Sequence, residues 1–436
     1  MHELAEELNR LIQNEPIVYD LLSEKAKRFY FPKGILAQAA EAALKGGKRN
    51  ATLGVSTFLG EPMYLQAAQK YFSNLAPKDL YFYAAVAGRP KLRQLWQKKM
   101  QQDNPSLSNP SLPFLTSGIT QSVALAGQMF LNPGDEVICP HLFWENYSLI
   151  FETDLGASLK LFALFQIQTQ NGMESYAGFN LAGLKERLQL CSKKVFLIFN
   201  FPNNPTGYSL TQTEQDALVF LLKEFAEKGL KIAVLCDDAY YGLFYEQNLA
   251  KESLFARIAK LHPNLLAIKA DGATKEMFMW GFRIGFLTFG YPAKNPESLY
   301  FALEKKLSGL VRTQLSNPSH PGQSVLEKIL EQDSFAQDYQ HWFQILKSRA
   351  KKAQSLLKNP NYKKYFEVYP FNSGYFLCLK INNNQAFLLR QKLLENHAIG
   401  TIAFSASDLR IAFSSVEEED LEGLFDNIYQ ACIELS

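Results

Sequence analysis

A strand–helix–strand unit in the middle of the chain restricts the fold more than any other feature. Lys194 to Phe201 (KVFLIFNF) is a continuous apolar run, typical of a central strand covered on both faces. Thr211 and Glu214 form a capping box for a helix that ends at Gly229. The run Leu230 to Cys236 predicts the next strand, which completes a crossover of the parallel type. The sequence therefore predicts an α/β fold with a mostly parallel sheet.

The carboxyl ends of these two strands carry polar side chains. Pro202-Asn203-Asn204-Pro205-Thr206-Gly207 follows the first strand, and Asp237-Asp238-Ala239-Tyr240 follows the second. Open α/β sheets bind their ligands at this edge. We therefore expect a ligand site where these two turns meet.

An earlier strand-to-helix junction has the form of a phosphate-binding turn. Pro113 to Thr116 is apolar, Ser117-Gly118 forms a turn, and Ile119 to Leu131 continues as an amphipathic helix. A glycine at such a junction exposes backbone N–H groups at the positive end of the helix, where anions bind. Any strand-to-helix turn can have this form, so the junction alone does not identify a ligand.

The segment Ile268 to Phe286 (IKADGATKEMFMWGFRIGF) places two cations in apolar surroundings. Leu265 to Ile268 predicts a buried strand that ends at Asp271-Gly272, so Lys275 lies just past a strand end. Arg283 is flanked by apolar residues, where an unpaired charge would be costly, so it should have an anionic partner. A lysine amine becomes a nucleophile toward carbonyls when burial and a neighbouring cation lower its pKa. Most lysines are solvated surface residues without a chemical role, and this interpretation of Lys275 competes with that of a nucleophile.

This segment resembles a known family. Thr274-Lys275 followed by Gly281-Phe282-Arg283-Ile284-Gly285 is similar to the cofactor-lysine segment of the class I/II aminotransferases, fold-type I enzymes that use pyridoxal phosphate (PLP). Pro202 to Gly207 resembles the family's Asn-Pro-x-Asn-Pro-Thr-Gly signature, with Phe201 as a departure. Similar segments follow in family order from about Gly54 to Arg410.

The resemblance implies the architecture. We expect a fold-type I PLP transferase, with a mostly parallel central sheet sandwiched by helices and a smaller α+β domain built from both termini. Residues 1–60 would form the N-terminal segment of the small domain, 61–321 the large PLP-binding domain, and 322–436 the C-terminal part of the small domain. A homodimer with shared active sites is also implied.

The resemblance further implies a set of cofactor-binding residues. By position, Lys275 would bind PLP covalently, Asp237 would hold the pyridine nitrogen, and Arg283 would bind the phosphate. Asp238 is the alternative to Asp237 in the adjacent register. The remaining implied contacts are Gly118, Ile119 and Thr120 in the phosphate loop, Trp144 stacked on the ring, Asn204 and Tyr240 at the 3′ oxygen, and Tyr83 reaching the partner's phosphate. Without the resemblance, Trp144 is better interpreted as a tryptophan packed under a loop, and Tyr83 equally well as a core or surface tyrosine.

Three residues would bind the substrate. Arg410, within Asp408 to Phe413, would bind the α-carboxylate, although an arginine in a strand is more often a surface ion pair. Gly54 would line the pocket. After Arg283 we expect a long amphipathic helical region that leads to Arg312, which in aspartate-type relatives pairs with a side-chain carboxylate across the dimer interface. Relatives with aromatic or small substrates also keep an arginine there, so it does not decide the substrate.

The implied activity is transfer of an amino group between an L-amino acid and a 2-oxo acid through a ping-pong cycle, with an aspartate/glutamate-type reaction and 2-oxoglutarate as one option. A PLP-dependent lyase of the same fold, such as a C–S lyase, would keep Lys275, Asp237 and Arg410 and stays an alternative. A PLP-dependent regulator would need a DNA-binding module, and the roughly 50 residues before Ala51 show no basic face.

The sequence departs from the family pattern at Gly272. This glycine stands where many relatives have a serine that contacts the phosphate.

Charge and cysteine content limit the other function classes. With 45 Lys and Arg against 43 Asp and Glu, the net charge is +2, which gives no general attraction to nucleic acid or anionic membranes. The five cysteines have neither metal-site nor disulfide spacing and are expected to be buried free thiols in a reducing compartment. No apolar run approaches the ~18 residues of a membrane helix, and the N-terminus does not read as a secretory signal, so we expect a cytoplasmic protein.

Overall fold

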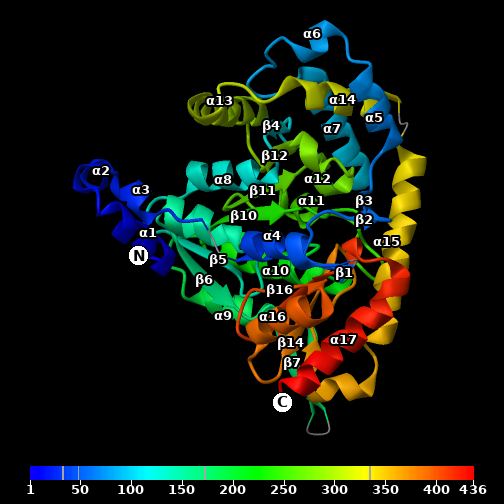
Figure 1. Cartoon of the computed structure of the whole chain (residues 1–436). Coiled ribbons are helices and arrows are strands. Elements are labelled where there is room, and N and C mark those ends of the chain that lie inside the picture. Colours follow the sequence, from blue (N-terminus) through cyan, green and yellow to red (C-terminus); the bar gives the residue numbers. More distant parts are fainter. Residues whose placement is uncertain (32–33, 48, 171–172, 333–334) are drawn as a thin grey trace.

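The computed structural model describes residues 1–31, 34–47, 49–170, 173–332 and 335–436. A seven-stranded sheet at its centre has the order β4-β12-β11-β10-β9-β5-β6 (Figure 1). β12 is antiparallel to both of its neighbours, and the other strands run parallel to one another. The predicted mostly parallel sheet is confirmed. Its strands are β4 (Phe114–Thr116), β5 (Glu136–Pro140), β6 (Ser158–Phe162), β9 (Lys194–Asn200), β10 (Lys231–Asp237), β11 (Leu265–Asp271) and β12 (Gly285–Gly290).

The predicted crossover joins β9 to β10 through α10 (Gln212–Glu227). Thr211 and Glu214 form the expected capping box at the start of this helix. β9 and β10 pair in parallel from Lys194 to Asn200, which brings Asn200 beside Asp237 at the carboxyl edge. This part of the sequence-based prediction is confirmed.

Both faces of the sheet are covered, which explains the continuous apolar runs. Phe196 and Ile198 of β9 pack in the core on the side of α8 (Ile119–Phe130), whereas Leu197 and Phe199 pack with α10. Successive side chains of a strand point to opposite faces of the sheet. In a strand covered on both faces every side chain is therefore buried, which favours apolar residues at all positions. The other helices of this part are α5 (Gln66–Ser73), α6 (Pro77–Leu80), α7 (Pro90–Asp103), α9 (Leu181–Gln189), α11 (Leu254–Ile258), α12 (Ala273–Glu276), α13 (Pro296–Gln314) and α14 (His320–Gln332).

The expectation of a helical region directly after Arg283 is wrong for residues Gly285–Gly290. They form β12, which is fully buried between β4 and β11. Neither strand order nor pairing direction can be read from a short apolar run, because the partners are distant in sequence. The expected helix is α13, and it begins only at Pro296, after an Asn295 cap.

A second, four-stranded antiparallel sheet has the order β13-β14-β17-β16. All four of its strands come from the C-terminal part of the chain, and the N-terminal β1 (Arg49–Asn50) joins this part by pairing with β15 (Ile399–Gly400). The helices of this part are α4 (Ile35–Lys45), α15 (Ala336–Leu356), α16 (Ala386–His397) and α17 (Leu421–Glu434), and the strands are β13 (Phe366–Val368), β14 (Phe376–Ile381), β16 (Ile402–Ala403) and β17 (Asp408–Ala412). The domain limits at residues 60 and 322 stay a prediction.

Two smaller features lie outside the main sheet. The first helices, α1 (Glu3–Ile12), α2 (Pro16–Leu21) and α3 (Glu24–Arg28), project at one side of the molecule (Figure 1). A hairpin of β7 (Phe165–Gln170) and β8 (Met173–Phe179) extends near the C-terminal part, and β2 (Thr57–Phe58) pairs with β3 (Glu61–Pro62). Four of the cysteines are buried and Cys191 is half-buried, and all five are free thiols. Among the described helices, none is long and apolar enough to cross a membrane.

Candidate active site

A cavity of about 320 Å³ lies at the carboxyl ends of β9, β10 and β11. The turns that follow these three neighbouring strands meet at the cavity, as expected for an open α/β sheet. Most of the residues singled out in the sequence line it: Gly54, Ile119, Thr120, Trp144, Asn204, Asp237, Tyr240, Lys275, Arg283 and Arg410. The structure thus brings together segments that are spread over most of the chain.

Lys275 lies in the short helix α12, directly after β11. Its Nζ is 5.0 Å from the centroid of the Tyr240 ring. Burial lowers the pKa of Lys275 to about 8; Asp237 opposes this shift, and Arg283 adds to it. A sizeable fraction of neutral amine near physiological pH is what a lysine nucleophile requires.

Asp237 lies buried at the end of β10 and is held by two donors. The Tyr147 hydroxyl donates to its Oδ2 at 2.5 Å, and the Ala239 backbone N–H donates to its Oδ1 at 3.2 Å. Burial raises the pKa of Asp237, while the hydrogen bond from Tyr147 and the charge of Lys275 act in the opposite direction. Burial alone favours the protonated form of Asp237, whereas the two hydrogen bonds and the nearby cation stabilise its ionised form.

Tyr147 and Asn200 contribute to this arrangement, and sequence reasoning missed both as site residues. Asn200 Nδ2 donates to the Asp237 carbonyl at 2.8 Å, and its Oδ1 accepts from the Asn204 backbone N–H at 2.7 Å. The Asn200 side chain therefore ties the turn after β9 to the end of β10. Its position as the last residue of a buried strand was the one available signal.

The phosphate-type turn is present between β4 and α8. Gly118 has φ of +88°, and a Cβ at this position would lie 2.3 Å from Nη2 of Arg283. The positive φ favours glycine, and a side chain at this position would displace the Arg283 guanidinium. Ile119 and Thr120 form the first turn of α8, whose free N–H groups favour an anion. The Arg283 guanidinium is thus held next to a helix N-terminus, and together they form one cationic end of the cavity.

Arg410 forms a second cationic place in the cavity. It is buried in β17; its Nη1 donates to Asn204 Oδ1 at 3.1 Å and its Nη2 to the Thr52 carbonyl at 3.0 Å. Its Cζ is 4.4 Å from the centroid of the Phe376 ring. Burial lowers the pKa of Arg410 to about 10. Its Nε is buried and has no hydrogen-bond partner among the described residues.

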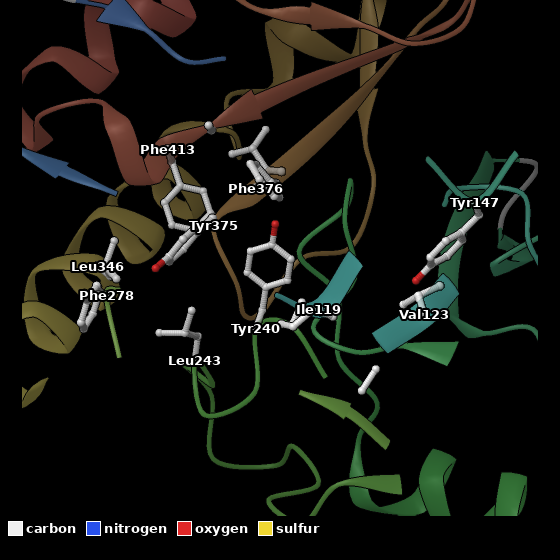
Figure 2. Close-up of a cluster of buried hydrophobic side chains, with 14 of the residues drawn as sticks. Ile119, Val123, Tyr147, Tyr240, Leu243, Phe278, Leu346, Tyr375, Phe376 and Phe413 are labelled. Atoms are coloured by element: carbon white, nitrogen blue, oxygen red, sulfur yellow. The ribbon is translucent and has the colours of Figure 1, made fainter. Parts of the chain in front are cut away.

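Tyr240 is fixed by aromatic packing. Its ring makes edge contacts with Tyr375 and Phe376, with centroid distances of 5.4 and 5.6 Å, and Figure 2 shows it between these side chains and Ile119. The Tyr240 side chain also lines the cavity. The orientation of Tyr240 therefore follows from packing against the C-terminal sheet.

Asp238 points away from the cavity and belongs to a buried ion cluster. Lys269 Nζ lies 3.0 Å from Asp238 Oδ2 and 2.6 Å from Asp271 Oδ2. Ser253 donates to Asp238, and Trp96 Nε1 donates to Asp271 at 3.1 Å. Of the two neighbouring aspartates, only Asp237 lines the cavity, so the adjacent-register alternative does not fit the geometry.

Two residues singled out in the sequence lie elsewhere in the described chain. Tyr83 is 89% exposed in the connection between α6 and α7. Arg312 is exposed on α13, where its Nη1 donates to Ser316 Oγ at 2.6 Å and Asn317 Oδ1 at 3.2 Å. Neither lines the cavity of its own chain.

The donor set fits PLP. Lys275 supplies an amine with a lowered pKa, Asp237 a buried carboxylate, and Arg283 with the start of α8 a place for a phosphate. Gly118 carries no Cβ, so the guanidinium can approach the turn closely. Trp144 and Tyr240 line the same cavity.

Comparison with known proteins agrees with this geometry. Residues 48–428 match the family model of aminotransferase class I and II. The aspartate/prephenate aminotransferase of Cereibacter sphaeroides is 28% identical over 356 residues, 77% of this chain and 80% of that protein. A probable N-acetyl-LL-diaminopimelate aminotransferase of Bacillus subtilis is 28% identical over 239 residues, 54% of this chain and 53% of that protein.

Solved structures show the same fold. An aminotransferase from Anaerococcus prevotii superposes with a TM-score of 0.82 at 24% identity, covering 94% of this chain and 98% of its own. The Pyrococcus horikoshii kynurenine aminotransferase superposes with a TM-score of 0.76 at 16% identity, covering 96% and 98%. The chain therefore belongs to the class I and II aminotransferases and is a PLP-dependent enzyme of fold-type I.

Proposed function

We propose that this chain transfers an amino group between an L-amino acid and 2-oxoglutarate, with Lys275 as the catalytic residue. The observation that carries the proposal is one cavity lined both by Lys275, whose amine has a pKa of about 8, and by the buried arginine Arg410. An amine that can exchange protons and a separate site for a carboxylate are the two requirements for handling an amino acid.

The roles of the chain's own residues follow from their contacts. Bound PLP supplies an electron sink for the electrons of the Cα–H bond. Arg410 binds the substrate α-carboxylate and so directs the Cα toward Lys275. The neutral Nζ of Lys275 takes the Cα proton, and the hydrogen bond from Tyr147 lowers the pKa of Asp237 against the effect of burial. Asn204, Tyr240 and Trp144 line the same cavity; the first two would hold the substituents of the bound ring, and Trp144 would pack against the ring.

We also propose a homodimer in which Tyr83 and Arg312 serve the partner's cavity. Both side chains are exposed and lie outside the cavity of their own chain, which is what residues with a role across an interface require. Arg312 would then meet the second carboxylate of glutamate or 2-oxoglutarate, because its planar guanidinium can bind a carboxylate in two places. Size-exclusion chromatography with light scattering tests the dimer directly.

The activity test titrates the PLP-bound protein with single L-amino acids. Transfer predicts loss of the visible cofactor band with formation of the matching 2-oxo acid, and recovery of the band when 2-oxoglutarate is added. Accumulation of pyruvate or ammonia without any oxo-acid acceptor would instead identify a lyase. Lys275→Ala should abolish the reaction, whereas Lys185→Ala, a change of a half-exposed lysine on α9, should not.

The role of Arg410 has its own matched control. Arg410→Met should raise KM for every amino acid by roughly 10- to 100-fold, because a charged hydrogen bond contributes about 1.5–3 kcal/mol. Arg390→Met removes an arginine of α16 that pairs with Glu41 instead, and should leave KM near the wild-type value. Equal effects of the two changes would exclude the proposed role of Arg410.

A further inference from the structure

The segment that carries Lys275 is held at both of its ends by one helix. It begins at Asp271, the last residue of β11, and ends at Glu276, the last residue of α12. Trp96 Nε1 donates to Asp271 Oδ2 at 3.1 Å, and Lys99 Nζ forms an ion pair with the Glu276 carboxylate. Trp96 and Lys99 both belong to α7. The backbone before and after Lys275 is therefore fixed from the same element.

The two contacts come from one face of α7. Trp96, Lys99 and Asp103 follow one another at intervals of three and four residues, which places their side chains on the same side of a helix. Asp103 Oδ2 lies 2.6 Å from Lys99 Nζ, so the ammonium is shared by two carboxylates. The Trp96 ring is buried and stacks on Phe286 of β12, with ring centroids 4.5 Å apart. Each of the two α7 side chains is thus itself held by a second contact.

Stability alone does not account for the ion pair between Lys99 and Glu276. The Glu276 side chain is 7% exposed and that of Lys99 is 18% exposed. Removing two charges from water offsets most of their attraction, and apolar residues of similar size often stabilise a fold as well or better. A charged pair with defined geometry does fix how its two elements lie relative to each other, which here are α7 and α12.

The contacts with α7 act on Lys275 without entering the cavity. Lys275 lines the cavity, whereas Trp96, Lys99, Asp271 and Glu276 do not. The lysine side chain is a flexible four-carbon stem, so its amine is placed reproducibly only if the backbone that carries it is fixed. Contacts on both sides of the lysine supply this restraint and leave the cavity open for ligands.

We propose that Trp96 and Lys99 are positioning residues for the Lys275 amine, because together they fix the backbone on both sides of the lysine and so set where Nζ lies in the cavity. This inference rests on the proposed catalytic role of Lys275. A displacement of about 1 Å from the reactive geometry can cost roughly 100-fold in reactivity. Loss of these contacts should therefore weaken the reactions of the amine and spare the rest of the site.

The test compares two cofactor forms that differ in their need for the lysine. The aldehyde of PLP can join Lys275 Nζ with loss of water, whereas the amine of pyridoxamine phosphate cannot. The full-length protein, freed of cofactor, is titrated with each form and binding is followed by absorbance and tryptophan fluorescence. The double variant Lys99→Met/Glu276→Gln removes the ion pair and leaves neither partner as an unpaired buried charge. It should bind PLP roughly 10- to 100-fold more weakly and pyridoxamine phosphate within about twofold of wild type.

A matched control lies on the same helix. Lys91 of α7 forms an ion pair with Glu331 of α14, and neither residue lines the cavity. Lys91→Met/Glu331→Gln should therefore bind both cofactor forms as the wild type does. Trp96→Phe keeps an aromatic ring beside Phe286 and removes only the N–H donor to Asp271, so it should show the same selective loss. Thermal unfolding of each cofactor-free variant shows whether it folds.

The outcomes separate this inference from the proposed function. An equal loss of affinity for PLP and pyridoxamine phosphate would indicate a general structural role and overturn the inference. Wild-type PLP affinity in the double variant, or in Trp96→Phe if the double variant does not fold, would overturn it as well. PLP affinity that is unchanged in Lys275→Ala would instead overturn the proposed function. A selective loss of PLP affinity, with the Lys91 control unchanged, supports the positioning role.

Discussion

Replacing Lys275 by methionine should stabilise the cofactor-free protein at neutral pH. Burial lowers the pKa of Lys275 from the usual 10.5 to about 8, even though the neighbouring carboxylate of Asp237 favours the charged form. The folded state is therefore a poor environment for the ammonium. Methionine has a similar length and no charge, so it removes this cost with little change in packing.

The size and sign follow from the two pKa values. A decrease from 10.5 to about 8 corresponds to about 3 kcal/mol, at about 1.4 kcal/mol per pKa unit. Below pH 8 the lysine is charged in both the folded and the unfolded state, and the whole cost applies. As pH rises from 8 to 10.5 the folded lysine is neutral while the unfolded one still binds a proton, so the cost falls to zero.

Urea unfolding of the full-length, cofactor-free protein measures this difference. Lys275→Met should unfold with a free energy up to about 3 kcal/mol higher than wild type near pH 7, and the gain should disappear near pH 10.5. Lys185→Met, at a half-exposed position, should show no such pH dependence. A Lys275→Met protein that is no more stable than wild type near pH 7, or a gain that persists at high pH, would refute the reasoning.

Three further substitutions test the site and its surroundings. Tyr147→Phe removes the 2.5 Å hydrogen bond to Asp237 and should raise the pKa of that carboxyl further and weaken PLP binding roughly tenfold, measured by fluorescence titration across pH. Gly118→Ala places a methyl group 2.3 Å from Arg283 Nη2, so PLP affinity should fall far more than pyridoxal affinity; equal losses would contradict this. Gly309→Ala, in open space on α13, should raise the unfolding free energy by about 1 kcal/mol, and a loss of stability would be unexpected.

The parts of the fold with local signals could be predicted from the sequence. The capping box at Thr211 and Glu214 and the apolar run of β9 act within a few residues, so they fix a helix start and a buried strand without tertiary information. The strand β12 could not be predicted in the same way. Its apolar sequence fits a buried helix or strand, and its direction depends on pairing with β4 and β11.

The residues of the candidate active site also divide into those that the sequence predicts and those that it does not. Asp237 and Lys275 could be found because each follows an apolar run and therefore lies at the edge of the sheet. Tyr147 could not, because its contact with Asp237 joins residues 90 positions apart through the order of the strands. Thr274 Oγ1 and Trp280 Nε1 are buried without a hydrogen-bond partner among the described residues, and this too is visible only once all neighbouring acceptors are placed.

The buried ion cluster restricts which substitutions the protein tolerates. We expect Lys269, Asp238 and Asp271 to be replaced together and not one at a time. The ammonium shares two buried carboxylates, so loss of Lys269 alone leaves them without a cation and costs about 3–5 kcal/mol. Apolar residues at all three positions would avoid that cost, but a lineage that changes one position at a time must pass through a destabilised protein. Relatives should therefore keep the whole triad or lack it entirely, and an alignment in which Lys269 varies while both aspartates persist would show that other groups can balance the charge.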